Sequence, residues 1–281
     1  MSKSNQTYKQ LAIPHFKEVF DIIDEILVKL NIPYYLIGAS AVALELLKGG
    51  IKPSRGTKDI DFAIMISSIQ EFEAVVKALL KYGFNKVEAP WTLYNDKFNI
   101  AIDLLPFGEI EEKFTIQFNE RYTDLHVLGF SEVLKESESV NIEEKSLKIP
   151  SLPGMVILKL IAWSDRPEER DNDLYDILRI IEHYFDLNYD NIMEHHHDTF
   201  TEEEIFDQLK IAARVLGRNS SKFLNVSDAI KNRILNTIND NVDNAESSAI
   251  AKQWVKNKDW ELEYAVQILK EFRFGLMDNL D

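Results

Sequence analysis

The chain has 281 residues, which is enough for one large domain or two modest ones. With 45% hydrophobic and 28% charged residues, its composition is globular and excludes collagen-like, low-complexity and wholly disordered classes. The 32 basic and 47 acidic side chains give a net charge of −15, which argues against a broad nucleic-acid-binding or membrane-binding face.

The first half of the chain is predicted to alternate between strands and helices. Apolar residues recur at intervals of three and four within 11–30, which predicts an amphipathic helix. Ser40 is expected to cap the next helix, and Pro106 to end the strand at 99–104. The expected strands are 34–37, 59–66, 84–87, 99–104, 115–118 and 125–130, and the other expected helices are 41–48 and 69–81.

The pattern changes after residue 150. Pro150 and the pair Pro153-Gly154 mark a break, and the rest of the chain has helical periodicity. We therefore expect an α/β domain at 1–150 and a helical domain at 151–281. The expected helices of the second domain are 155–163, 174–184, 202–216, 229–238, 249–255 and 261–274.

Two acids on one predicted strand are the first sign of chemistry. Asp59 and Asp61 are two residues apart, so their side chains point to the same face, with Cα atoms about 6–7 Å apart. The opposite face is apolar, which indicates a central strand rather than a solvated edge. Two carboxylates that project together repel each other unless a cation lies between them. The pair therefore predicts a Mg²⁺ site.

A third acid occupies an equivalent position on a later strand. In 98–104 the alternation places Asp103 on the face opposite to the apolar residues. If this strand lies beside the first, Asp59, Asp61 and Asp103 converge, and such a cluster can hold two Mg²⁺ ions about 3.5–4 Å apart. A structural cation site in a scaffold protein is an alternative interpretation of the same acids.

A phosphate site is predicted at the turn 38–40. Gly38 lets a phosphate approach the backbone, and Ser40 and the helix N-terminus supply hydrogen-bond donors. Lys52, Arg55 and Lys58 form a local basic cluster just before the two acids, which suggests phosphate neutralisation. Of these, Arg55 and Lys58 are the candidate phosphate contacts; ordinary surface charges are the alternative.

These motifs resemble those of the polymerase-β-like nucleotidyltransferase superfamily and, more narrowly, of the AbiEii-type toxin nucleotidyltransferases of bacterial defence and toxin–antitoxin systems. The narrower resemblance rests on Gly38-Ala39-Ser40-Ala41, on Arg55-Gly56-Thr57-Lys58-Asp59-Ile60-Asp61-Phe62 and on the segment LPGMVILKLIAWSDRPEERDNDLYDILR at 152–179. The resemblance implies an α+β fold, in which a mixed sheet flanked by helices precedes a helical C-terminal domain that completes the cleft.

Lys159 lies in a predicted helix that is apolar nearly all round. A lysine there needs an anionic partner or an exit to water. Members of the family place a Lys followed by an Asp-rich helix start here, and Lys159, Asp173 and Asp176 match. The resemblance implies that Lys159 contacts triphosphate or an active-site carboxylate, and that the two acids belong to the nucleotide site. The residues alone allow the acids to orient Lys159, Arg166 or Arg170, or simply to stabilise a helix dipole.

Several other classes of function are disfavoured. The chain has no cysteine, which excludes disulfides, thiolate zinc sites and cysteine nucleophiles and suits a cytoplasmic protein. No apolar run approaches the roughly 18–20 residues of a membrane helix, so we expect no membrane contact. Three adjacent histidines at 195–197 cannot all face one metal ion, and we expect them in an exposed loop. No nucleophile-elbow motif supports a hydrolase triad.

The sequence therefore favours a nucleotidyltransferase. Asp59 and Asp61 would bind a Mg²⁺ that bridges the phosphates of a nucleoside triphosphate. Asp103 would bind a second Mg²⁺ and take the proton of an acceptor hydroxyl, which attacks the α-phosphate as pyrophosphate leaves.

The resemblance further implies a toxin that acts on RNA, with tRNA 3′ ends as the leading acceptor, and an antitoxin partner. The charge of −15 gives little long-range attraction to RNA, so a small molecule or a protein side chain stays open as acceptor. A non-catalytic nucleotide-binding module that pairs with an antitoxin-like partner is the alternative from another class.

Overall fold

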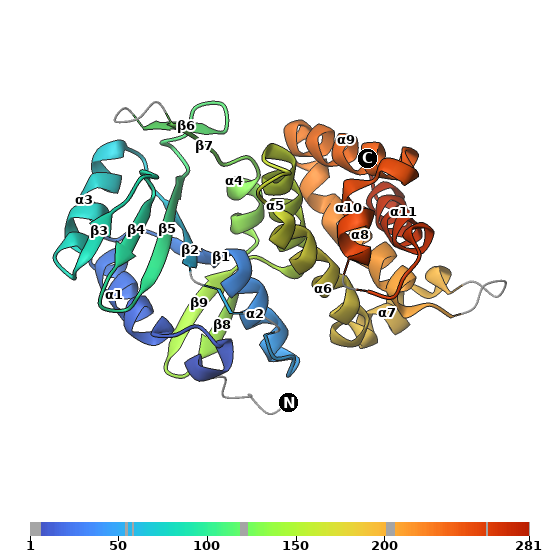
Figure 1. Cartoon of the computed structure of the whole chain (residues 1–281), viewed down its shortest axis with the longest axis horizontal. Coiled ribbons are helices and arrows are strands. Elements are labelled where there is room, and N and C mark those ends of the chain that lie inside the picture. The colour runs from blue at the N-terminus through green and yellow to red at the C-terminus, as the bar shows by residue number, and fades with distance from the viewer. Residues whose placement is uncertain are drawn as a thin grey trace. The chain divides into compact units, whose positions relative to one another are not determined.

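The computed structural model describes residues 7–53, 56–57, 59–118, 123–200, 206–256 and 258–280. The chain divides into two compact units, Met1–Ser151 and Leu152–Asp281 (Figure 1). The named strands belong to the first unit, whereas the described part of the second is helical. Within these ranges no helix has the length and apolar character needed to span a membrane.

A five-stranded mixed sheet forms the centre of the first unit. Its order is β1-β2-β5-β4-β3; β2 and β5 are parallel, and the other neighbours are antiparallel. This sheet and its helices give the α+β fold that the sequence predicts. The strands are β1 (Tyr34–Ile37), β2 (Asp59–Met65), β3 (Phe84–Lys86), β4 (Thr92–Asn95) and β5 (Ile100–Phe107).

Helices cover the apolar face of this sheet. Phe20 of α1 (Phe16–Lys29) stacks on Phe62 of β2 with 6.4 Å between the ring centroids, and both side chains are fully buried. Figure 1 shows α1 and α3 (Ile69–Leu80) beside the strands. Because successive side chains of a strand point to opposite faces, packing of Phe62 against α1 leaves Asp59 and Asp61 on the other face.

Smaller elements complete the first unit, and some differ from the prediction. A helix, α4, begins at Phe130, so the expected strand at 125–130 is wrong beyond His126. The strands β4, β8 and β9 and the helix α4 were not predicted. The additional elements are η1 (Tyr8–Leu11), α2 (Gly38–Lys48), β6 (Thr115–Phe118), β7 (Thr123–His126), α4 (Phe130–Lys135), β8 (Glu138–Ile142) and β9 (Lys145–Ile149).

Pro106 does not end its strand, contrary to expectation, because β5 continues to Phe107. The ladder between β5 and β4 stops at the pair Asp103 and Thr92, whereas the ladder with β2 continues through Pro106. A proline lacks the N–H group that a strand with partners on both sides needs. Pro106 is tolerated because one side of β5 has no β4 partner at that position.

The second unit is a set of packed helices. Pro153 and Gly154 lie in the first turn of α5, where a missing N–H costs nothing, rather than in a break before the helix. Of the expected helix 202–216, residues 202–205 lie outside the described residues, and α8 begins after Asp207, whose side chain caps it. The elements are α5 (Leu152–Asp165), α6 (Asp171–Leu187), α7 (Tyr189–His195), η2 (His197–Thr199), α8 (Gln208–Asn225), α9 (Asp228–Asp243), η3 (Ala245–Ser247), α10 (Ala249–Val255) and α11 (Leu262–Asp278).

Two glycines let α8 and α11 approach backbone to backbone. A Cβ atom added at Gly275 would lie 1.9 Å from the carbonyl oxygen of Arg214, and one added at Gly217 would lie 2.3 Å from that of Phe272. Real Cβ atoms do not come so close to backbone atoms, so a side chain at either position would force the two helices apart.

We expect Gly275→Ala to lower the free energy of unfolding by about 1–3 kcal/mol, the usual cost of overpacking. Urea denaturation measures it. In a helix without such a contact, Gly→Ala stabilises by about 1 kcal/mol, so the sign of the change is informative. A variant as stable as the parent would contradict the close helix contact.

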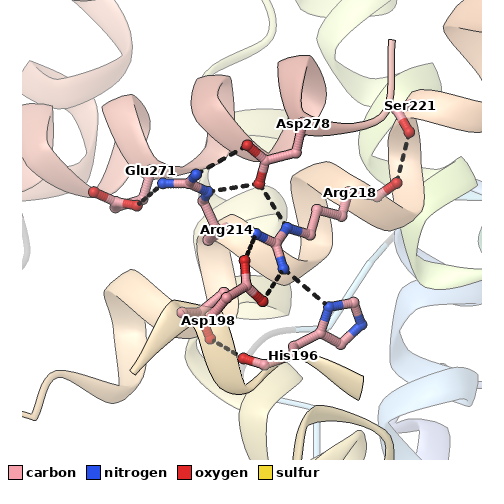
Figure 2. A network of polar contacts seen from close by, with 8 residues as sticks. His196, Asp198, Arg214, Arg218, Ser221, Glu271 and Asp278 are labelled. Atoms are coloured by element: carbon pink, nitrogen blue, oxygen red, sulfur yellow. Dashed lines mark hydrogen bonds and ion pairs between the residues drawn. The ribbon is translucent and has the colours of Figure 1, made fainter. Parts of the chain in front are cut away.

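An ionic network ties η2 and α11 to α8 (Figure 2). The guanidinium of Arg218 donates to both carboxylate oxygens of Asp198, and its Nε donates to Oδ2 of Asp278 at 2.6 Å. Arg214 donates to the same Asp278 at 2.8 and 2.9 Å and to Glu271 at 3.3 Å. Because Asp278 accepts from both arginines, the network holds the end of α11 against α8.

The three histidines at 195–197 do not form the exposed loop that the sequence predicts, because two of them lie in helical elements. His195 ends α7 and His197 begins η2, and both are exposed. His196 is half-buried, with its Nδ1 atom 3.3 Å from a guanidinium nitrogen of Arg218. The middle histidine therefore belongs to the ionic network rather than to a loop in solvent.

Hydrogen bonds from Arg218 lower the pKa of Asp198. Burial acts to raise the pKa of Asp278, but its bonds to both arginines lower it overall. A carboxyl whose pKa is lower in the folded state stabilises the fold above its unfolded pKa of about 4, and this stability is lost as pH falls through the folded pKa.

We therefore expect Arg218→Met to reduce the loss of stability on acidification from pH 5 to pH 2. Urea denaturation of the parent and the variant across this range measures the difference between the two pH dependences. Identical pH dependences would show that the network does not hold these carboxyls in their charged form.

Candidate active site

Two acids predicted from the sequence are direct neighbours in the sheet. In the parallel ladder of β2 and β5, the Cα partner of Asp61 is Asp103, and that of Asp59 is Ala101. Asp59 is exposed, and Asp61 and Asp103 are half-buried, while the residues between them are buried on the other face. The predicted alternation of both strands and their adjacency are confirmed, and the three acids share one face.

Each carboxylate has a local neighbour. Asp59 accepts a hydrogen bond from the hydroxyl of Thr57, and Asp103 accepts one from Thr92 with 2.5 Å between the oxygens. Within the described ranges no three acidic or histidine side chains are gathered into a group that could hold a metal ion. The three acids share one face of the sheet, and their convergence on shared Mg²⁺ ions stays a prediction.

The carboxylate of Asp61 lies where a side chain of residue 38 would be. Gly38 has a φ of +65°, a left-handed conformation that favours glycine, and an added Cβ atom would lie 1.9 Å from Oδ2 of Asp61. Gly38 is also the first residue of α2, whose N-terminus carries partial positive charge. This glycine therefore admits an acid to the helix terminus, in addition to the phosphate access predicted for it.

Ser40 is not the helix cap that the sequence predicts. The helix begins two residues earlier, at Gly38, with Ile37 at the N-cap position and no side-chain capping bond. Ser40 is 1% exposed, and its buried hydroxyl oxygen has no hydrogen-bond partner among the residues that the structure describes. An unsatisfied buried hydroxyl costs about 1–3 kcal/mol. It is the kind of group that a ligand oxygen at the helix N-terminus would satisfy.

The basic residues of the predicted phosphate site are mostly not placed. Arg55 and Lys58 lie outside the described residues, and Lys52 is exposed. The two threonines that bond the acids were not predicted. Thr92 is the first residue of an alternating pattern, Thr-Leu-Tyr-Asn. This pattern is the signal that could have identified β4 and placed the hydroxyl of Thr92 on the face of the acids.

In the second unit, Lys159 meets the two acids that the sequence paired with it. Lys159 is 6% exposed, and its Nζ atom lies 2.7 Å from Oδ1 of Asp173 and 2.9 Å from Oδ2 of Asp176. Of the predicted alternatives, the anionic partner is confirmed and the exit to water is wrong. Arg170 also reaches Asp173, at 3.5 Å, whereas Arg166 pairs with Glu169.

The surroundings of Lys159 keep it charged. Burial acts to lower the pKa of this lysine, but the nearby carboxylates of Asp173 and Asp176 outweigh burial and raise the pKa above its ordinary value. Asp173 lies in the first turn of α6, and Asp176 follows in the second, buried at 5% exposure. The helix dipole alone therefore does not account for Asp176, whose partner is the lysine.

We expect Lys159→Met to lower the free energy of unfolding by about 3–5 kcal/mol, because it leaves two carboxylates without their buried cation. Urea denaturation measures the loss. The control is Lys256→Met, which removes a lysine that is 59% exposed and lies 3.4 Å from Asp171. An exposed pair contributes at most about 1 kcal/mol. Equal effects of the two substitutions would contradict the buried ion pair.

The acids of β2 and β5 fit a divalent cation by their chemistry. They offer only carboxylate oxygens, which Mg²⁺ prefers as ligands. Paired Cα atoms of neighbouring strands are about 5 Å apart, so Asp61 and Asp103 project from adjacent positions on one face of the sheet. A triphosphate at the N-terminus of α2 would lie next to Asp61 and would need a cation between the two.

Comparison with known proteins adds a family match. The family model described as "Nucleotidyl transferase AbiEii toxin, Type IV TA system" matches residues 26–261. No curated protein matches the chain.

Solved structures with some likeness include an antigenic nucleotidyltransferase-like protein from Paracoccidioides brasiliensis. It is 18% identical over 87% of this chain and 94% of its own, with a TM-score of 0.43. The CCA-adding enzyme of Thermotoga maritima, solved with tRNA, is 16% identical over 97% of this chain and 66% of its own, with a TM-score of 0.33.

Proposed function

Because this chain belongs to the AbiEii family of nucleotidyl transferase toxins, whose model covers residues 26–261, we propose that it moves a nucleoside monophosphate from a triphosphate to an acceptor hydroxyl. The observation that carries the proposal is the shared face of Asp59, Asp61 and Asp103, with the carboxylate of Asp61 seated at Gly38 on the N-terminus of α2. Acids and a helix N-terminus meet there, as a metal–triphosphate complex requires.

In this proposal Asp59, Asp61 and Asp103 hold two Mg²⁺ ions. The ions supply positive charge that offsets the triphosphate and the charge that develops during transfer. Gly38 lets the phosphates approach the helix N-terminus beside the carboxylate of Asp61, and the buried hydroxyl of Ser40 supplies a hydrogen bond. Arg55 and Lys58 add positive charge for the same phosphates.

The transfer itself exchanges one phosphorus–oxygen bond for another. The acceptor oxygen forms a bond to the α-phosphorus, the bond from that phosphorus to the bridging oxygen breaks, and pyrophosphate leaves. The carboxylate of Asp103 takes the proton of the acceptor hydroxyl. Its neighbour Asp61 lies at the helix N-terminus, where a negative charge is stabilised.

Lys159 is proposed as a further catalytic residue, with Asp173 and Asp176 as nucleotide-binding residues. The family match includes all three positions, and the buried ion pairs support the proposal, because such pairs are expensive to keep for stability alone. We propose that the two acids hold the lysine in one orientation.

For the acceptor we propose an RNA 3′ hydroxyl, with tRNA as the leading substrate, and for the toxin an antitoxin partner. The description of the family as a type IV toxin–antitoxin system supports the antitoxin partner, and the RNA acceptor is what the resemblance to AbiEii-type toxins implies. The net charge of −15 favours instead an acceptor that needs no long-range attraction, such as a small molecule or a protein side chain. These acceptors are separate outcomes of one experiment.

The experiment incubates the protein and Mg²⁺ with each α-³²P-labelled nucleoside triphosphate and with total RNA, protein or small metabolites. We expect labelled RNA. Asp61→Asn should reduce the labelling by at least about 100-fold, because it removes a charge that acts on the transferred phosphate. The matched control is Asp124→Asn, at an exposed acid of β7, which should label like the parent.

Other outcomes decide among the alternatives. Label in protein or in metabolites would contradict the proposed RNA acceptor but support the proposed nucleotidyltransferase activity. Pyrophosphate release by Asp61→Asn at the parent rate would contradict the proposed site. A parent protein that binds triphosphates but releases no pyrophosphate with any of them would favour a non-catalytic nucleotide-binding module.

A further inference from the structure

The hydroxyl of Thr92 lies at the edge of the acidic face, where no part of the proposed reaction uses it. Three residues form a row across neighbouring strands, because Asp103 of β5 is the Cα partner of Asp61 on one side and of Thr92 on the other. The hydroxyl oxygen of Thr92 is 2.5 Å from Oδ1 of Asp103. This short bond joins a neutral donor to one carboxylate oxygen of a proposed catalytic acid.

The bond has a direction. Since β5 lies between β2 and β4, the bond holds Oδ1 of Asp103 on the side of β4. Asp61 lies on the opposite side, on β2. The donor is stiff, because a β-branched side chain in a strand has a restricted χ1 angle. Thr92 is half-buried, and its neighbour Leu93 is fully buried, so the strand that carries it is anchored.

We propose that Thr92 is a positioning residue, whose hydroxyl holds the carboxylate of Asp103 in the orientation needed for cation binding and proton transfer. The inference rests on the proposed function of Asp103. Groups that orient a metal ligand or a catalytic acid typically change metal affinity or activity by about 10–100-fold when they are removed. A carboxylate without such a bond rotates more freely and spends less time in the productive orientation.

Two substitutions separate the hydroxyl from the rest of the side chain. Thr92→Val keeps the shape and removes the donor, whereas Thr92→Ser keeps the donor and removes the methyl group. Thr115→Val is the matched control, because the hydroxyl of Thr115, on β6, contacts the ring of His126. The three proteins and the parent are compared in kcat, in KM for the triphosphate, in Mn²⁺ affinity and in urea midpoint.

We expect Thr92→Val to lower kcat by about 10-fold or more and to weaken binding of Mn²⁺ alone, followed by electron paramagnetic resonance. KM for the triphosphate and the urea midpoint should change little. Thr92→Ser should restore kcat and Mn²⁺ affinity to within about threefold of the parent, because it restores the donor. Thr115→Val should match the parent in all four measurements.

Three results would overturn the inference. Parent-like kcat and Mn²⁺ affinity in Thr92→Val would show that the bond does not matter for the acid. If Thr92→Ser does not restore kcat and Mn²⁺ affinity, the loss in Thr92→Val is not due to the missing hydroxyl, and the methyl group of Thr92 is the group that matters. A further loss of kcat when Thr92→Val is added to Asp103→Asn would show that Thr92 does not act through Asp103, and this comparison holds even if the single valine variant is less stable.

The failure of this inference is distinguishable from failure of the proposed function. If Asp61→Asn abolishes transfer and Thr92→Val leaves both kcat and Mn²⁺ affinity unchanged, the transferase stands and only the positioning role is lost. If Asp61→Asn transfers nucleotide as well as the parent, the proposed function itself fails.

Discussion

The contact between the carboxylate of Asp61 and Gly38 is the constraint on which the proposed site depends. The acid occupies the space that any side chain at residue 38 would fill, and the left-handed backbone at that residue turns the chain from β1 into α2. One glycine therefore serves two purposes, because it makes the turn and it admits a negative charge to a helix N-terminus. The pairing of Ile37 with Asp61 in the ladder of β1 and β2 holds both sides of this contact.

Around this contact the sheet separates an apolar face from an acidic one. Phe62 is buried against Phe20 of α1, and the alternation of β2 then places Asp59 and Asp61 together on the other face. Packing of a hydrophobic core thus aligns charges that repel each other, since the burial of the aromatic rings outweighs the modest repulsion between half-exposed acids. Two of these carboxylates accept hydrogen bonds from nearby hydroxyls, Asp59 from Thr57 and Asp103 from Thr92.

The second unit contains the opposite arrangement, in which charges are buried and paired. Lys159 lies within the apolar helix α5 and is held by Asp173 and Asp176 of α6. Apolar side chains at all three positions together would fill the same space at lower cost, because buried ion pairs lose most of their attraction to desolvation. By contrast, the arginines of α8 bind acids near the surface, and the packing of α8 on α11 depends on glycines rather than on charge.

The sequence by itself determined the local features, because these depend on residues close together along the chain. The sequence predicted the alternation of β2 and β5, the amphipathic helix α1 and the need of Lys159 for a partner. It also contained the family motifs at 38–41, 55–62 and 152–179. Only the tertiary structure decided that Asp61 adjoins Gly38, that the helix begins before Ser40, that β5 continues through Pro106 and that Thr92 bonds Asp103. These features arise from the register between strands, which is set by packing of the whole sheet and not by any one segment.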